Sequence, residues 1–160
     1  MSEMNEQRSS GESALRVAAV SDLHYGRHGA GAHRDLLRAA MAEAAALVLC
    51  GDLTDYGLPE EAQLLVDDLH AAGTVPVLAV LGNHDWESDR QDEVRDVLEA
   101  GGVTVLDGTC TVIEGVGFAG VRGFAGGFGR WALSAWGEAS IKTFVQEAVD
   151  EALRLDAALG

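Results

Sequence analysis

The sequence predicts an α/β fold built on a parallel sheet. Apolar segments of strand length alternate along the chain with segments whose apolar residues recur at helical spacing. The strand segments are apolar throughout rather than at every second residue, which is typical of parallel sheets that are covered on both faces. Polar side chains follow three of these segments directly, and ligands of such sheets bind beyond the carboxyl ends of the strands.

The first part of the chain predicts a strand–helix unit that is repeated three times. We expect strands over residues 15–20, 47–50 and 77–81, helices over residues 34–45 and 90–100, and a further helix that begins at Pro59. Proline is favoured in the first turn of a helix. The apolar residues of that helix recur at i, i+3, i+4 and i+7, namely Ala62, Leu65, Val66 and Leu69. Right-handed crossovers would bring the carboxyl ends of the three strands to one edge of the sheet.

The remainder of the chain follows a different pattern. Short strands with tight turns are expected over residues 103–106, 109–114 and 117–121, as in a hairpin. A glycine-rich loop over residues 123–136 precedes a long helix over residues 139–159. One side of this helix carries Ile141, Val145, Ala148, Ala152, Leu155 and Leu159. We expect a disordered polar tail over residues 1–14 and one domain over residues 15–160.

Composition narrows the classes of function. The length of 160 residues is typical of one domain. The formal net charge of −15 argues against a nucleic-acid-binding patch, because such surfaces need clustered Lys and Arg. No segment has the pattern of a signal peptide or the length of a membrane span. Cys50 and Cys110 lie in apolar stretches without Cys-x-x-Cys spacing, so we expect buried, reduced thiols and a cytoplasmic protein.

Polar residues follow each of the three predicted strands: Asp22 and His24 after the first, Asp52 after the second, and Asn83 and His84 after the third. A turn or a helix cap explains one such residue, but not the same pattern three times. Carboxylate, imidazole and amide ligands together suit Mn, Fe or Zn. We expect two divalent metal ions, with Asp22 and His24 on the first, Asn83 on the second, and Asp52 bridging both.

The segments Asp22-Leu-His24, Gly51-Asp52 and Gly82-Asn83-His84-Asp85 occur in this order, each at the tip of an apolar run. Together they resemble the motifs of the calcineurin-like metallophosphoesterases. This resemblance implies a β-sandwich flanked by helices, a dinuclear metal centre, and hydrolysis of a phosphomonoester or a phosphodiester as substrate. It also implies that His84 assists the leaving group and that Asp85 orients His84.

The sequence departs from this family in one respect. The family takes further metal ligands from its carboxyl-terminal half, including a Gly-His-x-His motif, whereas none of the five histidines lies after His84. We therefore expect a truncated domain, without the carboxyl-terminal part of the second sheet and with an incomplete second metal site. The alternative to an active phosphatase or phosphodiesterase is a fragment that binds metal without efficient catalysis. Such a fragment would be inactive, or completed by a carboxyl-terminal partner chain or by a second copy.

Two rival enzyme classes lack their motifs in this chain. A haloacid-dehalogenase-type phosphatase needs Asp-x-Asp after the first strand, where this sequence has Asp22-Leu-His24. A nucleotide-binding switch needs a glycine-rich phosphate loop with a lysine. Arg122 and Arg130 have the chemistry to bind phosphate, but we interpret them as surface charges. The loop over residues 123–136 is our candidate for substrate specificity.

Overall fold

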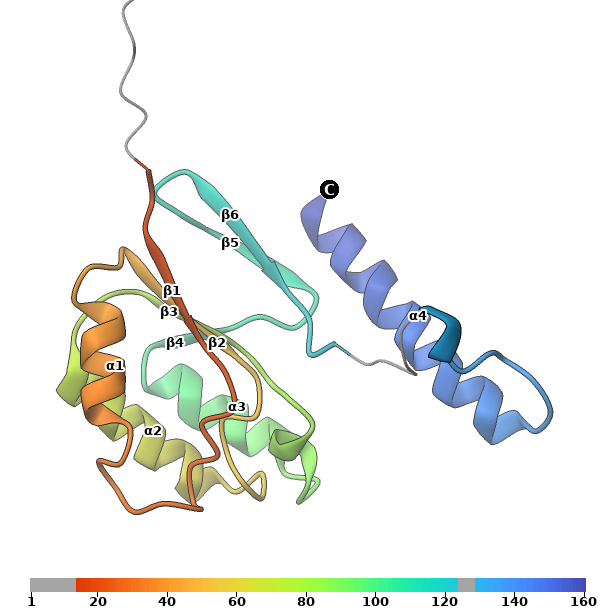
Figure 1. The fold of residues 1–160 in the computed structure, drawn as a ribbon, viewed down its shortest axis with the longest axis horizontal. Helices are drawn as coiled ribbons and strands as arrows, with labels where there is room; N and C mark the ends of the chain where they lie inside the picture. Colours follow the sequence, from red (N-terminus) through yellow and green to blue (C-terminus); the bar gives the residue numbers. More distant parts are fainter. Residues whose placement is uncertain (1–13, 124–128) are drawn as a thin grey trace, which may run out of the picture.

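The computed structural model describes residues 14–123 and 129–160 (Figure 1), so most of the predicted tail and residues 124–128 of the predicted specificity loop lie outside the described residues. A parallel sheet in the order β1-β2-β3-β4 forms the centre of the fold. Its strands are β1 (Val17–Val20), β2 (Ala46–Cys50), β3 (Val77–Val80) and β4 (Val103–Val105). The predicted parallel sheet is confirmed. Residues 103–105, which we expected beside the hairpin, instead extend this sheet as β4, because α3 (Gln91–Ala100) provides the crossover from β3.

The helices that connect these strands form one layer. They are α1 (Arg34–Met41), α2 (Pro59–Ala72) and α3. Each strand is added on the same side of the preceding one, so successive right-handed crossovers place all three helices on the same face of the sheet. In agreement, α1 packs against α2 and α2 packs against α3 (Figure 1).

The hydrophobic core lies between this helical layer and the sheet. Leu47 and Leu49 of β2 are fully buried, as are Leu37 of α1, Leu65 of α2 and Leu98 of α3. Burial of apolar side chains is the main favourable contribution to folding. This core therefore fixes the strands firmly and, with them, the positions of the polar residues that follow the strand ends.

The last part of the chain lies against the opposite face of the sheet near β3 and β4, whereas Val17 of β1 stays 39% exposed. β5 (Thr109–Ile113) and β6 (Val116–Gly120) pair as an antiparallel hairpin. Gly120 lies close against Val80 and Leu106, which are not part of the main core. The long helix α4 (Ala139–Leu159) contacts both hairpin strands (Figure 1). A parallel sheet and a second, antiparallel sheet flanked by helices confirm the predicted α/β fold class.

One expectation about burial is wrong, because Cys50 and Cys110 are both exposed. Cys50 follows Leu49 of the core and so points away from the helical layer. The apolar side of α4 is poorly covered. Leu159 remains 69% exposed, whereas the buried residue of α4 is Glu151. Polar contacts therefore contribute much of the attachment of α4 to the rest of the fold.

Candidate metal centre

The pairing of β1 with β2 continues beyond the ends of both strands. The backbone N–H of Asp22 donates to the carbonyl oxygen of Gly51 at 3.2 Å, and that of His24 donates to the carbonyl oxygen of Asp52 at 3.0 Å. These hydrogen bonds hold the two segments side by side at the carboxyl edge of the sheet. As a result, the predicted ligands from the first two strands lie next to each other.

The backbone at these residues has an unusual conformation. The φ angles are 58° at Asp22, 44° at His24 and 50° at Asp52. Non-glycine residues rarely adopt positive φ, and each costs about 1–3 kcal/mol unless the surroundings enforce it. In the described ranges only Asp89 and Glu114 share this feature among non-glycine residues. Strained residues cluster at functional sites, so their coincidence with three predicted ligands supports a site here.

Three of the predicted site residues converge. His24, Asp52 and His84 each offer one ligand atom, and these three atoms lie within 4.8 Å of one another. The two imidazole rings meet edge to face, with 4.5 Å between their centroids. All three residues are half-buried. Two imidazoles and one carboxylate form a donor set that suits Zn, Mn or Fe.

The surroundings of His24 fit a bound cation. Its Nδ1 atom is buried and has no hydrogen-bond partner. The Oδ1 atom of Asp55 approaches it to 3.2 Å, but the geometry is not that of a hydrogen bond. Buried polar nitrogens normally make a hydrogen bond, so one that makes none at a convergence of ligands is consistent with a metal-binding role.

Asp22 and Asn83 lie at the same edge but outside this three-residue group. Both are exposed, and Asn83 lines a pocket of about 360 Å³ together with Asp52. The structure thus brings His24 and Asp52 together with His84, which we expected in the role of a catalytic residue. The ligand roles of Asp22 and Asn83 stay predictions.

The ring of His84 is fixed by the loop that follows β2. Its Nδ1 atom lies 2.9 Å from the carbonyl oxygen of Asp55. Because a carbonyl oxygen only accepts, Nδ1 carries the hydrogen, and Nε2 is left for a cation or a substrate oxygen. This hydrogen bond raises the pKa of His84 above its usual value, and the charges of Asp52 and Asp55 add to the effect, while burial and Arg27 oppose it.

Asp85 does not contact the His84 ring. Its buried carboxylate instead accepts hydrogen bonds from the backbone N–H of Leu53 at 3.2 Å, of Thr54 at 2.8 Å and of Gly82 at 2.8 Å. The Thr54 hydroxyl donates a further bond at 2.6 Å. Asp85 therefore ties the segment after β3 to the segment after β2, and the orienting contact with His84 that we expected from it is made by Asp55.

Asp55 is the site residue that sequence reasoning missed. Its buried carboxylate pairs with Arg27 at 2.6 Å and approaches His24, while its carbonyl oxygen holds His84. Groups that hold an imidazole from behind determine its orientation and tautomer, and the carbonyl oxygen of Asp55 does this for His84. The available signal was its place three residues after Asp52, in the segment Gly51-Asp52-Leu-Thr-Asp55.

The glycines of the motifs are explained by a close approach between the strand tips. A Cβ atom on Gly82 would collide with the carboxylate and the backbone nitrogen of Asp52. Gly51 has a φ of 84°, and a Cβ atom there would press on the backbone of Gly82. The tips of β2 and β3 can therefore approach only because both positions lack a side chain.

The comparison with protein families agrees with this geometry. Residues 15–146 match the family model described as calcineurin-like phosphoesterase. The match spans most of the chain, and the chain therefore belongs to the calcineurin-like phosphoesterase family, whose members generally hydrolyse phosphoesters and typically bind two divalent metal ions. No curated protein matches the chain. Within the described residues, every helix is too short or too polar to cross a membrane.

Proposed function

We propose that this chain hydrolyses a phosphoester at a centre of divalent metal ions held by His24 and Asp52, with Asp22 and Asn83 as further ligands. The convergence of His24 and Asp52 with His84 within 4.8 Å carries this proposal, because it places two ligands beside a group that can donate a proton. Divalent ions held by these residues would supply Lewis-acid chemistry for attack on the phosphoryl group. Mn, Fe and Zn are the metals that suit the available ligands.

The residues of the chain would supply the remaining steps. Hydrolysis joins a water oxygen to phosphorus, breaks the bond between phosphorus and the ester oxygen, and places a proton on the departing alcohol. The hydrogen bond from Nδ1 to Asp55 leaves Nε2 of His84 to face the site, so His84 is placed to give that proton. Asp55 would hold the ring in place through its carbonyl oxygen.

A combined measurement of metal content and hydrolysis tests this proposal. The chain would be stripped with a chelator, reloaded with Mn, Fe or Zn, and assayed on a generic aromatic phosphomonoester and on the matching phosphodiester. Asp52→Asn should abolish metal-dependent hydrolysis, whereas Asp35→Asn, at an exposed position of α1, should leave it unchanged. Hydrolysis that survives metal removal would contradict the proposal.

A second candidate is a metal-binding chain that catalyses efficiently only after association with another chain or with a second copy. The observation in its favour is exposed apolar surface on the hairpin and α4, including Val112 at 67% and Leu153 at 60%. Large exposed apolar patches mark association sites. Light scattering during size-exclusion chromatography, with hydrolysis assayed on each species, would separate the two candidates. Equal specific activity of monomer and assembly would exclude the second.

A further inference from the structure

The pocket beside the metal centre combines acidic and basic groups. It is lined by Cys50, Gly51, Asp52, Gly82, Asn83, Trp86, Arg122 and Gly123. In the described parts of the chain, Arg122 is the basic side chain of this lining. Because Arg122 follows β6, it enters the pocket from the second sheet, whereas Asp52 and Asn83 enter it from the first.

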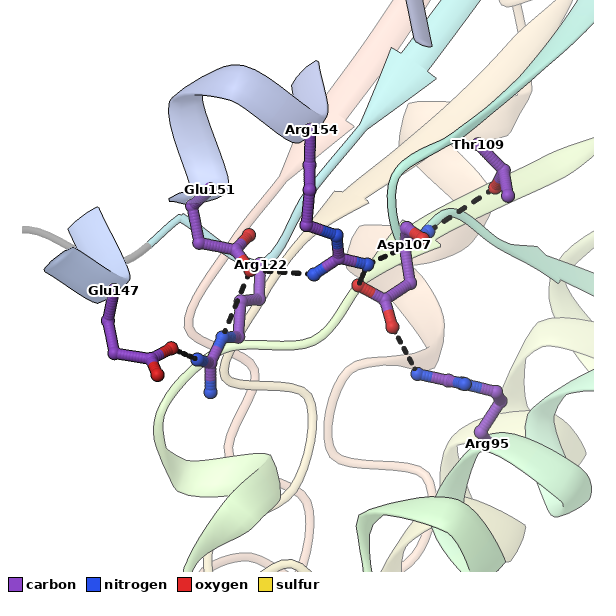
Figure 2. Close-up of polar contacts among 7 residues, drawn as sticks. All are labelled: Arg95, Asp107, Thr109, Arg122, Glu147, Glu151 and Arg154. Atoms are coloured by element: carbon purple, nitrogen blue, oxygen red, sulfur yellow. Dashed lines mark hydrogen bonds and ion pairs between the residues drawn. The ribbon is translucent and has the colours of Figure 1, made fainter. Parts of the chain in front are cut away.

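Contacts on two sides position the Arg122 guanidinium. Its central carbon lies 4.6 Å from the centroid of the Trp86 ring, and Trp86 belongs to the short helix η1 (His84–Trp86) that carries His84. On the other side, Nη2 lies 3.1 Å from Glu147 and Nε lies 3.6 Å from Glu151, both on α4 (Figure 2). The guanidinium is therefore placed between the metal-site loop and two carboxylates.

We propose that Arg122 binds a phosphoryl oxygen of the substrate in this pocket and that Glu147 of α4 competes with the phosphoryl group for it. This inference rests on the proposed function. A guanidinium stays charged at all relevant pH values and matches phosphate oxygens with two parallel N–H donors. An anionic ester must approach a chain with a net charge of −15, so a cation in the pocket lining would offset the repulsion.

The contact with Trp86 provides a local probe. The chain holds three tryptophans, and Trp131 and Trp136 are 76% and 62% exposed. Replacing both by phenylalanine leaves Trp86 as the sole emitter, so inorganic phosphate that draws the guanidinium away should change its fluorescence. We would titrate phosphate into the metal-free and the manganese-loaded protein in this background.

Substitutions should change the phosphate affinity in opposite directions. Arg122→Gln should weaken binding about 10- to 100-fold, as expected for loss of a charge-assisted contact, and Arg122→Lys should weaken it less. Glu147→Gln should strengthen binding about two- to fivefold, because a competing charge is removed. Arg38→Gln, on exposed α1, is the matched control and should bind phosphate like the parent.

Each result has one interpretation. Unchanged phosphate affinity in Arg122→Gln, or in Arg122→Lys if the first variant does not fold, would overturn the inference. Weaker binding in Glu147→Gln would overturn the competition, since it would make Glu147 a support for Arg122. If these variants bind metal and hydrolyse ester like the parent, the proposed function survives while the inference fails. Absence of metal binding in the parent would instead refute the proposed function.

Discussion

The carboxylate of Asp85 accepts two hydrogen bonds from Thr54: its Oδ1 atom accepts one from the backbone N–H at 2.8 Å and one from the hydroxyl at 2.6 Å. Asp85 is fully buried, and its carboxylate also accepts from Leu53 and Gly82. The conformation of the loop that carries Asp52 and Asp55 therefore depends on a residue of the next strand tip.

The first prediction concerns this role of Asp85. Asp85→Ala would leave several buried backbone N–H groups unpaired, and one such group costs about 1–3 kcal/mol. We expect the free energy of unfolding, measured with urea, to fall by about 3 kcal/mol or more. Asp96→Asn, exposed on α3, should leave it unchanged. Stability near that of the parent would show that the loop is held without Asp85.

The second prediction concerns the glycine between the strand tips. Gly82→Ala places a Cβ atom against the Asp52 carboxylate, so Asp52 must move. Divalent metal should then bind at least about tenfold more weakly, because a loss of about 1.4 kcal/mol of binding free energy corresponds to a tenfold change in affinity. Gly117→Ala is the matched control, because no atom lies within 4 Å of a Cβ atom there. Isothermal titration with manganese measures both. Equal affinities for the two variants would contradict the close approach.

The third prediction separates two roles of His84. If His84 protonates the leaving group, His84→Ala should lower kcat by about 10²–10⁴-fold while the metal content stays intact. If Nε2 binds metal, metal and activity should be lost together. Elemental analysis and kinetics on one preparation decide between these roles, with His70→Ala, exposed on α2, as the control. We expect the first result, in agreement with the proposed function.

The fourth prediction concerns the ion pairs that hold α4. Arg154 of α4 and Arg95 of α3 meet on the carboxylate of Asp107, at 2.5 and 2.7 Å (Figure 2). Burial acts to raise the pKa of Asp107, but the two arginines outweigh it and hold that pKa below its usual value. A lowered carboxyl pKa stabilises the fold above the unfolded pKa of about 4, and this contribution is lost as the pH falls through the folded pKa.

Asp107→Asn should therefore cost about 1–2 kcal/mol of unfolding free energy at pH 7, and the cost should shrink as the pH falls below about 4. Urea unfolding of both proteins across this range measures the difference. Asp150→Asn, exposed on α4, should show no such trend. A difference that is constant at every pH would mean that the charge of Asp107 is unimportant.

The sequence was sufficient for the parts of the fold that follow from periodicity and strand hydrophobicity. The buried positions Leu65 and Leu69 of α2 were predicted from helical spacing, and the parallel sheet from strands that are apolar throughout. The poor coverage of the apolar side of α4 has a physical reason. An apolar stripe shows that a helix can pack, but the charges on Glu151 and Arg154 determine where this helix is held.

Sheet topology made the location of the candidate site predictable, but not every residue that contributes to it. Crossover handedness brings His24, Asp52 and His84 to one edge, but the role of Asp55 depends on the path of the loop after β2. That path is fixed by the hydrogen bonds of Asp85, which join segments about 30 residues apart, and no local pattern indicates them. Because no local pattern indicates such long-range contacts, we interpreted Arg122 from the sequence as a surface charge, whereas the structure places it in the pocket lining.

The most direct test of the account is the manganese content of the parent and of Asp52→Asn, measured by elemental analysis after exhaustive dialysis. Asp52 lies at the point where the strand tips meet, and its Oδ1 atom also accepts from the backbone N–H of His84 at 3.0 Å. The parent and the exposed-site variant Asp35→Asn should retain metal, whereas Asp52→Asn should lose it while remaining folded. Equal metal content in the parent and in folded Asp52→Asn would contradict the account.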